Sequence, residues 1–240
     1  MCEHYVARAA EPFRFDELWP FTERLERYGI AGFGWGAAWI ATDGTIESHR
    51  DIRAFADDPG RENVGAVETT AALVHLRRPS KLSTLGMADT QPFDDPAGRF
   101  SFSHNGDLRN VRTWRTQYRA AGRIHGRADT EVGARWLEDA WTADPEPDPV
   151  RALHDLHSTF GGQANLSLLT ADGGVTAYAG NTENPLFTFR LGRIGLACTG
   201  IYSLDRSIFR FAATGATERD LVRVGCSVTL DRNGRASQAS

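Results

Sequence analysis

The sequence has few cysteines and no long apolar run, and each shortage excludes a class of protein. Its three cysteines, Cys2, Cys198 and Cys226, are an odd number without a Cys-x-x-Cys pair. Neither a disulfide framework nor a thiolate metal site is therefore expected, which favours a reduced, cytoplasmic protein. The uncharged stretch at residues 28–42 is too short and too rich in glycine to span a bilayer.

Charge of one sign is also missing. The net charge is −4, acidic and basic residues are mixed along the whole chain, and Lys81 is the only lysine. Without a basic stripe to neutralise phosphates, no nucleic-acid partner is expected. The first residues include Glu3 and Arg8 instead of a basic stretch followed by an apolar run, so neither a secretory signal nor a membrane partner is expected.

The 240 residues, 41% hydrophobic and 24% charged, fit one globular domain spanning 1–240. Hydrophobic periodicity predicts strands at 3–10, 32–42, 71–77, 99–104, 165–170, 175–179, 186–191, 194–198, 208–213 and 227–230, and helices at 15–28, 108–121, 130–141 and 149–160. Residues 235–240 are expected to fray. Strands, then helices, then strands, without βα alternation, predict an α+β fold with stacked antiparallel sheets.

Cys2 is the most informative residue, because removal of Met1 would place its thiol and a free α-amino group on one residue. An α-amine titrates near about 7.7–8.0 and a free thiol near about 8.5, so the amine can accept the thiol proton at neutral pH. Cys2 would then be a nucleophile that carries its own base. An isolated Met-Cys start is more often only an early residue on a dispensable terminus, so the hypothesis needs other support.

A second candidate feature ends the strand predicted at 99–104. The segment FSFSHNGDL at 100–108 contains Asn105 and Gly106, whose side-chain amide and backbone N–H can converge on a developing oxyanion. Taken alone, Asn-Gly is more often the type I′ turn of a β-hairpin.

Four motifs now coincide in one order: Met-Cys at the start, His75-Leu76-Arg77, Ser103-His104-Asn105-Gly106 and Asp129-Thr130-Glu131. In this the chain resembles the class II glutamine amidotransferases, which are N-terminal-nucleophile hydrolases. The resemblance runs to about residue 138 and includes GFGWGAAW at 32–39. It implies a four-layer αββα sandwich of two antiparallel sheets.

The resemblance also implies a role for each motif residue and requires no cofactor and no metal. Cys2 would attack the γ-carboxamide carbon of glutamine, while the Asn105 side chain and the Gly106 N–H stabilise the oxyanion. Arg77 would bind the substrate α-carboxylate, to which its planar fork is suited, and Asp129 would bind the α-ammonium. Arg78 remains an alternative carboxylate ligand, and Asp129 is also expected to be the N-cap of the following helix.

Three segments depart from the family pattern. RPSK at 78–81 lacks the sequence of a small residue, Thr or Ser, and His-Gly that usually follows the arginine. ADTQPF at 88–93 has Asp89 in place of the usual asparagine. TGIYSL at 199–204 stands where the family usually has Ala-Ser-Glu-Pro near the site. Substrate contacts made by the first segment and the wall of the acyl pocket are therefore expected to differ.

Three functions follow as hypotheses. The first is a glutaminase that forms a Cys2 thioester and supplies ammonia to a separate synthetase. The second is a free-standing γ-glutamyl amide or peptide hydrolase in a small-molecule thiol or secondary-metabolite pathway. The third is a non-catalytic binding module that keeps the fold, against which the intact Cys2 and its oxyanion pair argue.

Overall fold

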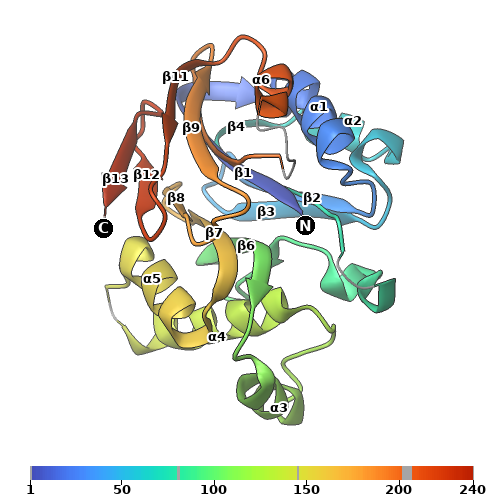
Figure 1. Cartoon of the computed structure of the whole chain (residues 1–240), viewed down its shortest axis with the longest axis vertical. Helices are drawn as coiled ribbons and strands as arrows, with labels where there is room; N and C mark the ends of the chain where they lie inside the picture. The colour runs from blue at the N-terminus through green and yellow to red at the C-terminus, as the bar shows by residue number, and fades with distance from the viewer. Residues whose placement is uncertain (1, 80–81, 145, 202–206, 240) are drawn as a thin grey trace.

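Two antiparallel β-sheets lie face to face, and helices cover the outer face of each (Figure 1). This computed structural model describes residues 2–79, 82–144, 146–201 and 207–239. The first sheet has seven strands in the order β11 (Thr217–Leu221), β9 (Leu186–Leu191), β10 (Ile194–Thr199), β1 (Glu3–Arg14), β4 (Glu68–Leu76), β2 (Trp35–Ile40) and β3 (Ile46–Asp51).

The second sheet has six strands in the order β13 (Ala236–Ala239), β12 (Ser227–Leu230), β8 (Val175–Tyr178), β7 (Gly162–Thr170), β6 (Phe100–Leu108) and β5 (Phe93–Asp94). Three helices pack on the first sheet: α1 (Trp19–Gly29), α2 (Arg61–Gly65) and α6 (Ile208–Ala212). Three others pack on the second: α3 (Arg112–Ala120), α4 (Asp129–Ala143) and α5 (Pro149–Phe160). Short 3₁₀ turns lie at Phe15–Glu17, Phe55–Asp57, Leu82–Thr84 and Met87–Asp89.

Three apolar layers result from the alternation of side chains along the strands. In β1, Tyr5 and Ala7 point outward into the layer beneath α1, whereas Val6 points inward. The inward layer is filled from both sheets, for example by Leu73 of β4 and Leu169 of β7. This produces the four-layer αββα arrangement that the sequence and its resemblance predict.

Local sequence explains where several elements begin and end. Pro20 lies in the first turn of α1, where a missing N–H costs no hydrogen bond, so the helix is not bent by it. Helix α5 begins at Pro149, and the side chain of Asp148 caps it by accepting from the Val150 N–H at 2.9 Å. The β2–β3 hairpin turns at residues 43–44.

Two predicted elements are wrong. Residues 208–213 were expected as a strand, but Ile208–Ala212 form helix α6, which buries Phe209 and Ala212 one turn apart against the first sheet. The tail was expected to fray, but Ala236–Ala239 form β13, which pairs with β12 from Ser227 to Leu230. In both cases a tertiary contact decides the conformation.

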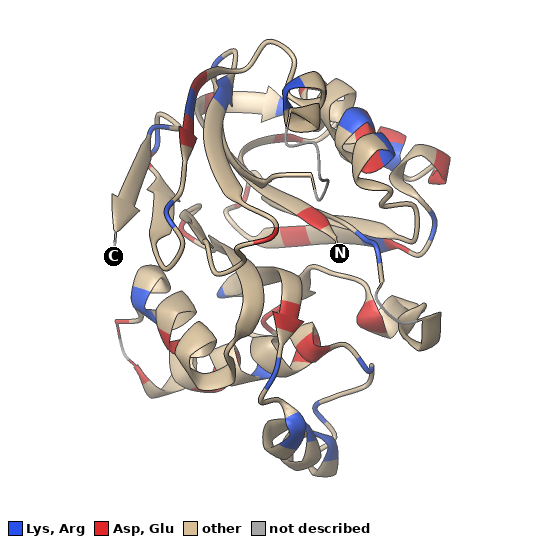
Figure 2. Cartoon of the chain, in the orientation of Figure 1, with Lys and Arg blue, Asp and Glu red and all other residues tan. Residues whose placement is uncertain are grey.

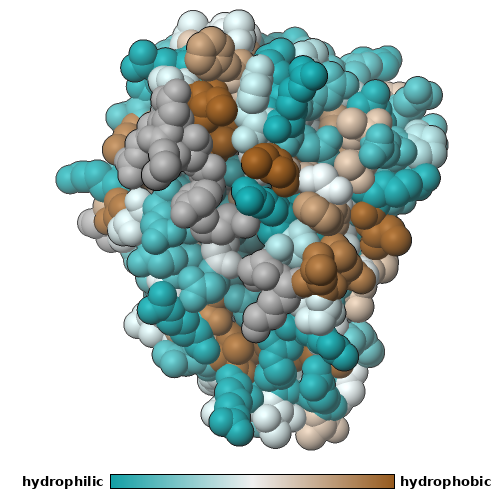
Figure 3. All heavy atoms as spheres, turned by 45° about the vertical axis from the view of Figure 1, so that its right-hand side comes forward, coloured by the Kyte–Doolittle hydropathy of each residue, from teal (hydrophilic) through white to brown (hydrophobic). Residues whose placement is uncertain are grey.

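The face in Figure 3 is mostly hydrophilic, with apolar side chains in small groups. The large apolar side chains of the described residues are mainly buried in the three layers, and a few, such as Ile30 and Phe211, are exposed. No helix in the described ranges combines the length and the apolar composition required to cross a bilayer.

Candidate active site

The strand pairing brings the predicted site residues to one end of the sandwich. Cys2 immediately precedes β1 and Arg77 immediately follows β4, and the two strands run antiparallel with Glu3 opposite Leu76. The start of β1 therefore lies beside the end of β4. Asn105 and Gly106 approach from the second sheet, in β6.

A polar cavity of about 730 Å³ opens at this end. Four of the five predicted residues line it, namely Cys2, Arg77, Gly106 and Asp129, and the fifth, Asn105, contacts Cys2 directly. A volume of this size lies in the range of about 300–1,000 Å³ that is typical of small-molecule sites.

The Cys2 thiol is held by the backbone of Arg78. The Arg78 N–H donates to Sγ at 3.3 Å, and the thiol donates to the Arg78 carbonyl at 3.6 Å. Burial raises the pKa of the Cys2 thiol above its usual value, and the Arg78 N–H offsets only part of this effect. The thiol is therefore protonated at neutral pH and needs a base before it can act as a nucleophile.

The Asn105 side chain is fully buried and fixed in orientation. Its Oδ1 accepts hydrogen bonds from Nδ2 of Asn165 and Nδ2 of Asn184, each at 3.3 Å. Because Oδ1 faces two donors, Nδ2 is turned toward Cys2, where it donates to the Cys2 carbonyl oxygen. An amide nitrogen has two N–H groups, so the second is available to another acceptor.

Gly106 continues β6, so the hairpin-turn interpretation of Asn-Gly is wrong. The strand runs on to Leu108, with Asn105 opposite Asn165 and Gly106 opposite Ala164. Gly106 has φ +124°, and a Cβ there would overlap the carbonyl of Gln163. Only glycine fits this left-handed position, where the backbone of β6 lies close to that of Gln163 in β7.

Arg77 is buried and its guanidinium lies against the segment that closes one side of the cavity. Nη1 donates to the Gly86 carbonyl and to Thr90 Oγ1, both at 3.3 Å, and Nη2 donates to the Thr84 carbonyl. Burial lowers the pKa of Arg77, but a guanidinium keeps its charge in proteins. Arg78 also lines the cavity, and it contacts Cys2 through its main chain.

Asp129 is the first residue of α4, and Ala128 occupies the N-cap position in its place. The prediction that Asp129 is the N-cap of this helix is therefore wrong. The Asp129 carboxylate accepts instead from the Leu108 N–H at 2.7 Å through Oδ2, and from the Thr130 N–H at 3.1 Å through Oδ1. These contacts tie α4 to β6 and leave the carboxylate at the cavity wall.

Gln91 supports the site and was missed by the sequence reasoning. Its Oε1 accepts from the His104 N–H at 2.7 Å and from Ser103 Oγ at 3.1 Å, and its Nε2 donates to the His104 carbonyl at 3.0 Å. The Gln91 side chain thus bonds to the backbone of β6 as the backbone of a neighbouring strand would. Asn165 was also missed, since its position opposite Asn105 is visible only once the strand register is known.

Asp89, the departure from the family pattern, has a structural role. Its Oδ1 accepts the N–H groups of Arg127 and Ala128 at 2.5 and 2.6 Å, so it fixes the loop before α4. Of the other departures, residues 80–81 and 202–206 lie outside the described part of the chain. Thr199, at the start of the third segment, donates to Glu3 Oε2 at 2.6 Å.

Buried histidines lie between the sheets beneath the site. His4 Nδ1 is 3.2 Å from Ser103 Oγ and its Nε2 is 3.4 Å from Ser167 Oγ, so one ring joins both sheets. Burial lowers the pKa of His4 to about 3, and burial also lowers the pKa of its neighbour His75 well below the usual value. Both rings are therefore neutral at physiological pH.

We expect stability to fall as the pH drops below about 6.5. Unfolded His4 binds a proton near that pH, whereas folded His4 binds one only near pH 3, so acid favours the unfolded chain. The stabilisation is complete above pH 6.5 and declines by about 1.4 kcal/mol per pH unit for this histidine alone.

Urea unfolding at pH 7.5 and pH 5.5 measures this loss. His4→Gln should decrease the difference between the two pH values, whereas the same change at exposed His125 should not. An unaltered pH dependence in His4→Gln would contradict the assignment.

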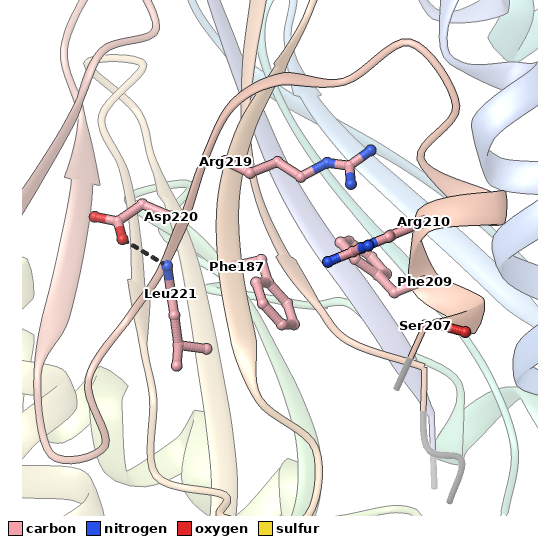
Figure 4. Close-up of a pocket in the computed structure, with 7 residues that line it drawn as sticks. All are labelled: Phe187, Ser207, Phe209, Arg210, Arg219, Asp220 and Leu221. Carbon is pink, nitrogen blue, oxygen red and sulfur yellow. Dashed lines mark hydrogen bonds between the residues drawn. The ribbon is translucent and has the colours of Figure 1, made fainter. Parts of the chain in front are cut away.

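A second cavity, of about 640 Å³, lies on the outer face of the first sheet between β9, β11 and α6 (Figure 4). Phe187 and Phe209 stack there with ring centroids 5.0 Å apart, and Arg210 and Arg219 also line the cavity. None of the predicted site residues is among those that line it.

The model of the family "Glutamine amidotransferases class-II" matches residues 14–190. In sequence, no curated protein matches. Glutamine phosphoribosylpyrophosphate amidotransferase from B. subtilis matches in structure, with a TM-score of 0.72 and 17% identity over 99% of this chain and 49% of that chain. A structure described as the allosteric regulatory enzyme of purine biosynthesis is similar to the same extent, with a TM-score of 0.72 and 16% identity over 99% of this chain and 48% of that one.

A glutamine aminotransferase class-II domain protein from Silicibacter pomeroyi matches with a TM-score of 0.60 and 18% identity, over 98% of both chains. This chain thus spans about half the length of the first two structures and nearly all of the third. The likenesses confirm the predicted fold, and the family match covers well over half of the residues. The chain belongs to the class II glutamine amidotransferases.

Proposed function

We propose that this protein hydrolyses the γ-amide of glutamine through a thioester on Cys2, releasing glutamate and ammonia. One observation carries the proposal: Cys2 lies at a cavity that Arg77 and Asp129 also line, and the fixed amide of Asn105 donates to the main-chain carbonyl of Cys2. A nucleophile, an oxyanion donor, a cation and an anion are then available to one substrate.

Removal of Met1 would free the α-amine of Cys2. This amine is the base that the thiol, with its raised pKa, needs. The α-amine takes the thiol proton as Sγ attacks the γ-carbon of glutamine. The carbonyl oxygen becomes an oxyanion that accepts from the free N–H of the Asn105 amide and from the Gly106 N–H. Collapse of this intermediate breaks the C–N bond, and the α-ammonium returns its proton to the leaving ammonia. Water then attacks the thioester, releasing glutamate and restoring the thiol.

Substrate recognition follows from opposite charges on the cavity wall. The guanidinium of Arg77 is held in place by backbone oxygens and can present its remaining N–H groups to the α-carboxylate. The Asp129 carboxylate, anchored on Leu108 and Thr130, can accept from the α-ammonium. A zwitterionic amino acid fits this pair, and a separate synthetase would use the ammonia.

A second candidate is the hydrolysis of a γ-glutamyl amide or peptide by the same steps, with an amine as leaving group. The cavity volume of about 730 Å³ favours it, because free glutamine would fill only part of that space.

The glutamine-site label diazo-oxo-norleucine, combined with mass spectrometry, tests the proposed chemistry. We expect the mature protein to begin at Cys2, and the label to modify Cys2 as glutamate release from glutamine stops. Buried Cys198 and Cys226 serve as internal controls and should stay unmodified. Full activity with Met1 retained, or activity that survives complete labelling of Cys2, would contradict the mechanism.

A further inference from the structure

Asp89 lies between the two charged side chains that are proposed to bind the substrate. Thr90, the next residue in the chain, accepts a hydrogen bond from Nη1 of Arg77 at 3.3 Å. On its other side, Asp89 Oδ1 accepts from the N–H of Ala128 at 2.6 Å, and Ala128 directly precedes Asp129. The Asp89 carboxylate is thus located between the cation and the anion of the cavity.

The fold uses only one oxygen of this carboxylate. Oδ1 accepts the N–H groups of both Arg127 and Ala128, which holds the loop before α4. Among the residues that the structure describes, Oδ2 has no hydrogen-bond partner and Asp89 forms no ion pair. Asp89 is 7% exposed and lines the cavity, and Oδ2 is not closed off from solvent. The oxygen without a partner therefore faces the cavity.

The surroundings of Asp89 are positively charged. Burial lowers the pKa of Arg77 and of Arg115, and the attraction of Asp89 offsets part of this effect at both guanidinium groups. Figure 2 shows an acidic position in the turn Met87–Asp89 and basic positions on α3. The carboxylate thus lies near cations without a direct contact to either, and one oxygen remains for a ligand.

An α-ammonium offers three N–H donors, and Asp129 is a limited acceptor for them. Each Asp129 oxygen already accepts one backbone N–H, from Leu108 or from Thr130. A charge that leaves water for a cavity requires partners for its hydrogen bonds. Asp89 Oδ2 supplies an acceptor that no backbone group occupies.

We propose that Asp89 Oδ2 is a second ligand for the substrate α-ammonium, and that the protein therefore selects γ-amides with a free α-amino group. The inference rests on the proposed hydrolysis at Cys2 and names a residue that determines its specificity. The α-carboxylate and α-ammonium of an amino acid are bonded to one carbon atom. A group between Arg77 and Asp129 therefore meets the ammonium when the carboxylate binds Arg77. The usual asparagine at this position has no charge, so the second carboxylate is a feature of this chain.

Two substrates that differ in one group test the proposal: glutamine and glutaramate, which is glutamine without its α-amino group. Asp89→Asn should lower the ratio of their kcat/KM values by about tenfold or more, the range expected for a hydrogen bond to a charged group. The loss should appear as a higher KM for glutamine with little change in kcat. Asparagine keeps an oxygen for the N–H groups of Arg127 and Ala128 and places a neutral amide at Oδ2, so the loop keeps its contacts.

Asp231→Asn is the matched control. Asp231 Oδ1 also accepts two backbone N–H groups, those of Asn233 and Arg235, both at 2.8 Å, but Asp231 does not line the cavity. The ratio for glutamine and glutaramate should equal that of the unaltered protein. An unchanged ratio in Asp89→Asn, or an equal loss for both substrates, would overturn the inference.

Calorimetric titration in the Cys2→Ala background separates this inference from the proposed reaction. Adding Asp89→Asn should lower the affinity for glutamine relative to glutaramate by the same factor. This result, together with no release of glutamate from glutamine by the intact protein, would contradict the reaction and support the ammonium site. Turnover of glutamine by the intact protein, with relative affinities that Asp89→Asn leaves unchanged, would contradict the ammonium site alone.

Discussion

Cys2→Ala is expected to abolish the release of glutamate from glutamine, with a loss on the order of 10⁶-fold in kcat, as for other enzymes that lose their nucleophile. No other group can form the thioester, because the remaining cysteines, Cys198 and Cys226, are buried in apolar strand layers. The measurement is an enzyme-coupled glutamate assay on purified protein, with thermal unfolding to verify the fold.

Two further variants make the result specific. Cys226→Ala should keep its activity, since that thiol lies in the inner apolar layer away from the cavity. Cys2→Ser keeps the size of the side chain and an N-terminal amine, but its hydroxyl is a much weaker nucleophile, so activity should remain far below that of the unaltered protein. Glutaminase activity of Cys2→Ala at the normal rate would remove Cys2 from the mechanism.

Asn105→Ala is expected to lower kcat by about 10²–10³-fold, the effect of removing one oxyanion donor. The KM for glutamine should change little, because the amide acts on charge that develops only after the attack. Steady-state kinetics over a range of glutamine concentrations separates the two constants.

Asn105→Asp sharpens this test. Aspartate keeps the oxygen that faces Asn165 and Asn184 but replaces the donor with a second oxygen, so those two contacts survive, the contact with the Cys2 carbonyl is lost and the oxyanion is repelled. Its loss in kcat should be at least as large as that of the alanine variant. Exposed Asn110 lies just beyond β6, and Asn110→Ala should leave kcat as it is. A higher KM with unchanged kcat in the Asn105 variants would instead assign Asn105 to ground-state binding.

Much of the fold could be predicted, because the buried strands carry strong local signals. Residues 186–191 and 194–198 are apolar runs separated by a glycine turn, and they form β9 and β10 almost as expected. Residues 149–160 have proline at the start and glycine after the end, and they form α5.

The errors arise where neighbours decide the conformation. IFRFAA at 208–213 has the alternating aromatic residues of a strand, yet Phe209 and Ala212 are buried together only if the segment is helical. The alanine, serine and glutamine residues of Ala236–Ala239 carry no strand signal, and they become β13 because β12 offers them an open edge.

Among the site residues, too, some could be predicted from the sequence, whereas others depend on which elements lie side by side. The residues of the four motifs could be identified only through their combination, because Met-Cys or Asn-Gly taken alone has a more common explanation. Gln91 and Asn165 could not, since amide side chains are common and their roles depend on which strand lies beside which. Nor could Arg115 and Arg119 of α3 be assigned to the cavity, because that depends on how the helix packs.

The orientation of Asn105 has a consequence for how the chain could be divided. Every motif residue lies before residue 132, whereas the two amides that aim Asn105, those of Asn165 and Asn184, lie after residue 160. The first part of the sequence thus supplies the groups that react, and the second part supplies the two amides that orient Asn105. A split protein would contain all the signature residues in one fragment, and that fragment would regain an aligned amide only by reassociating with the other.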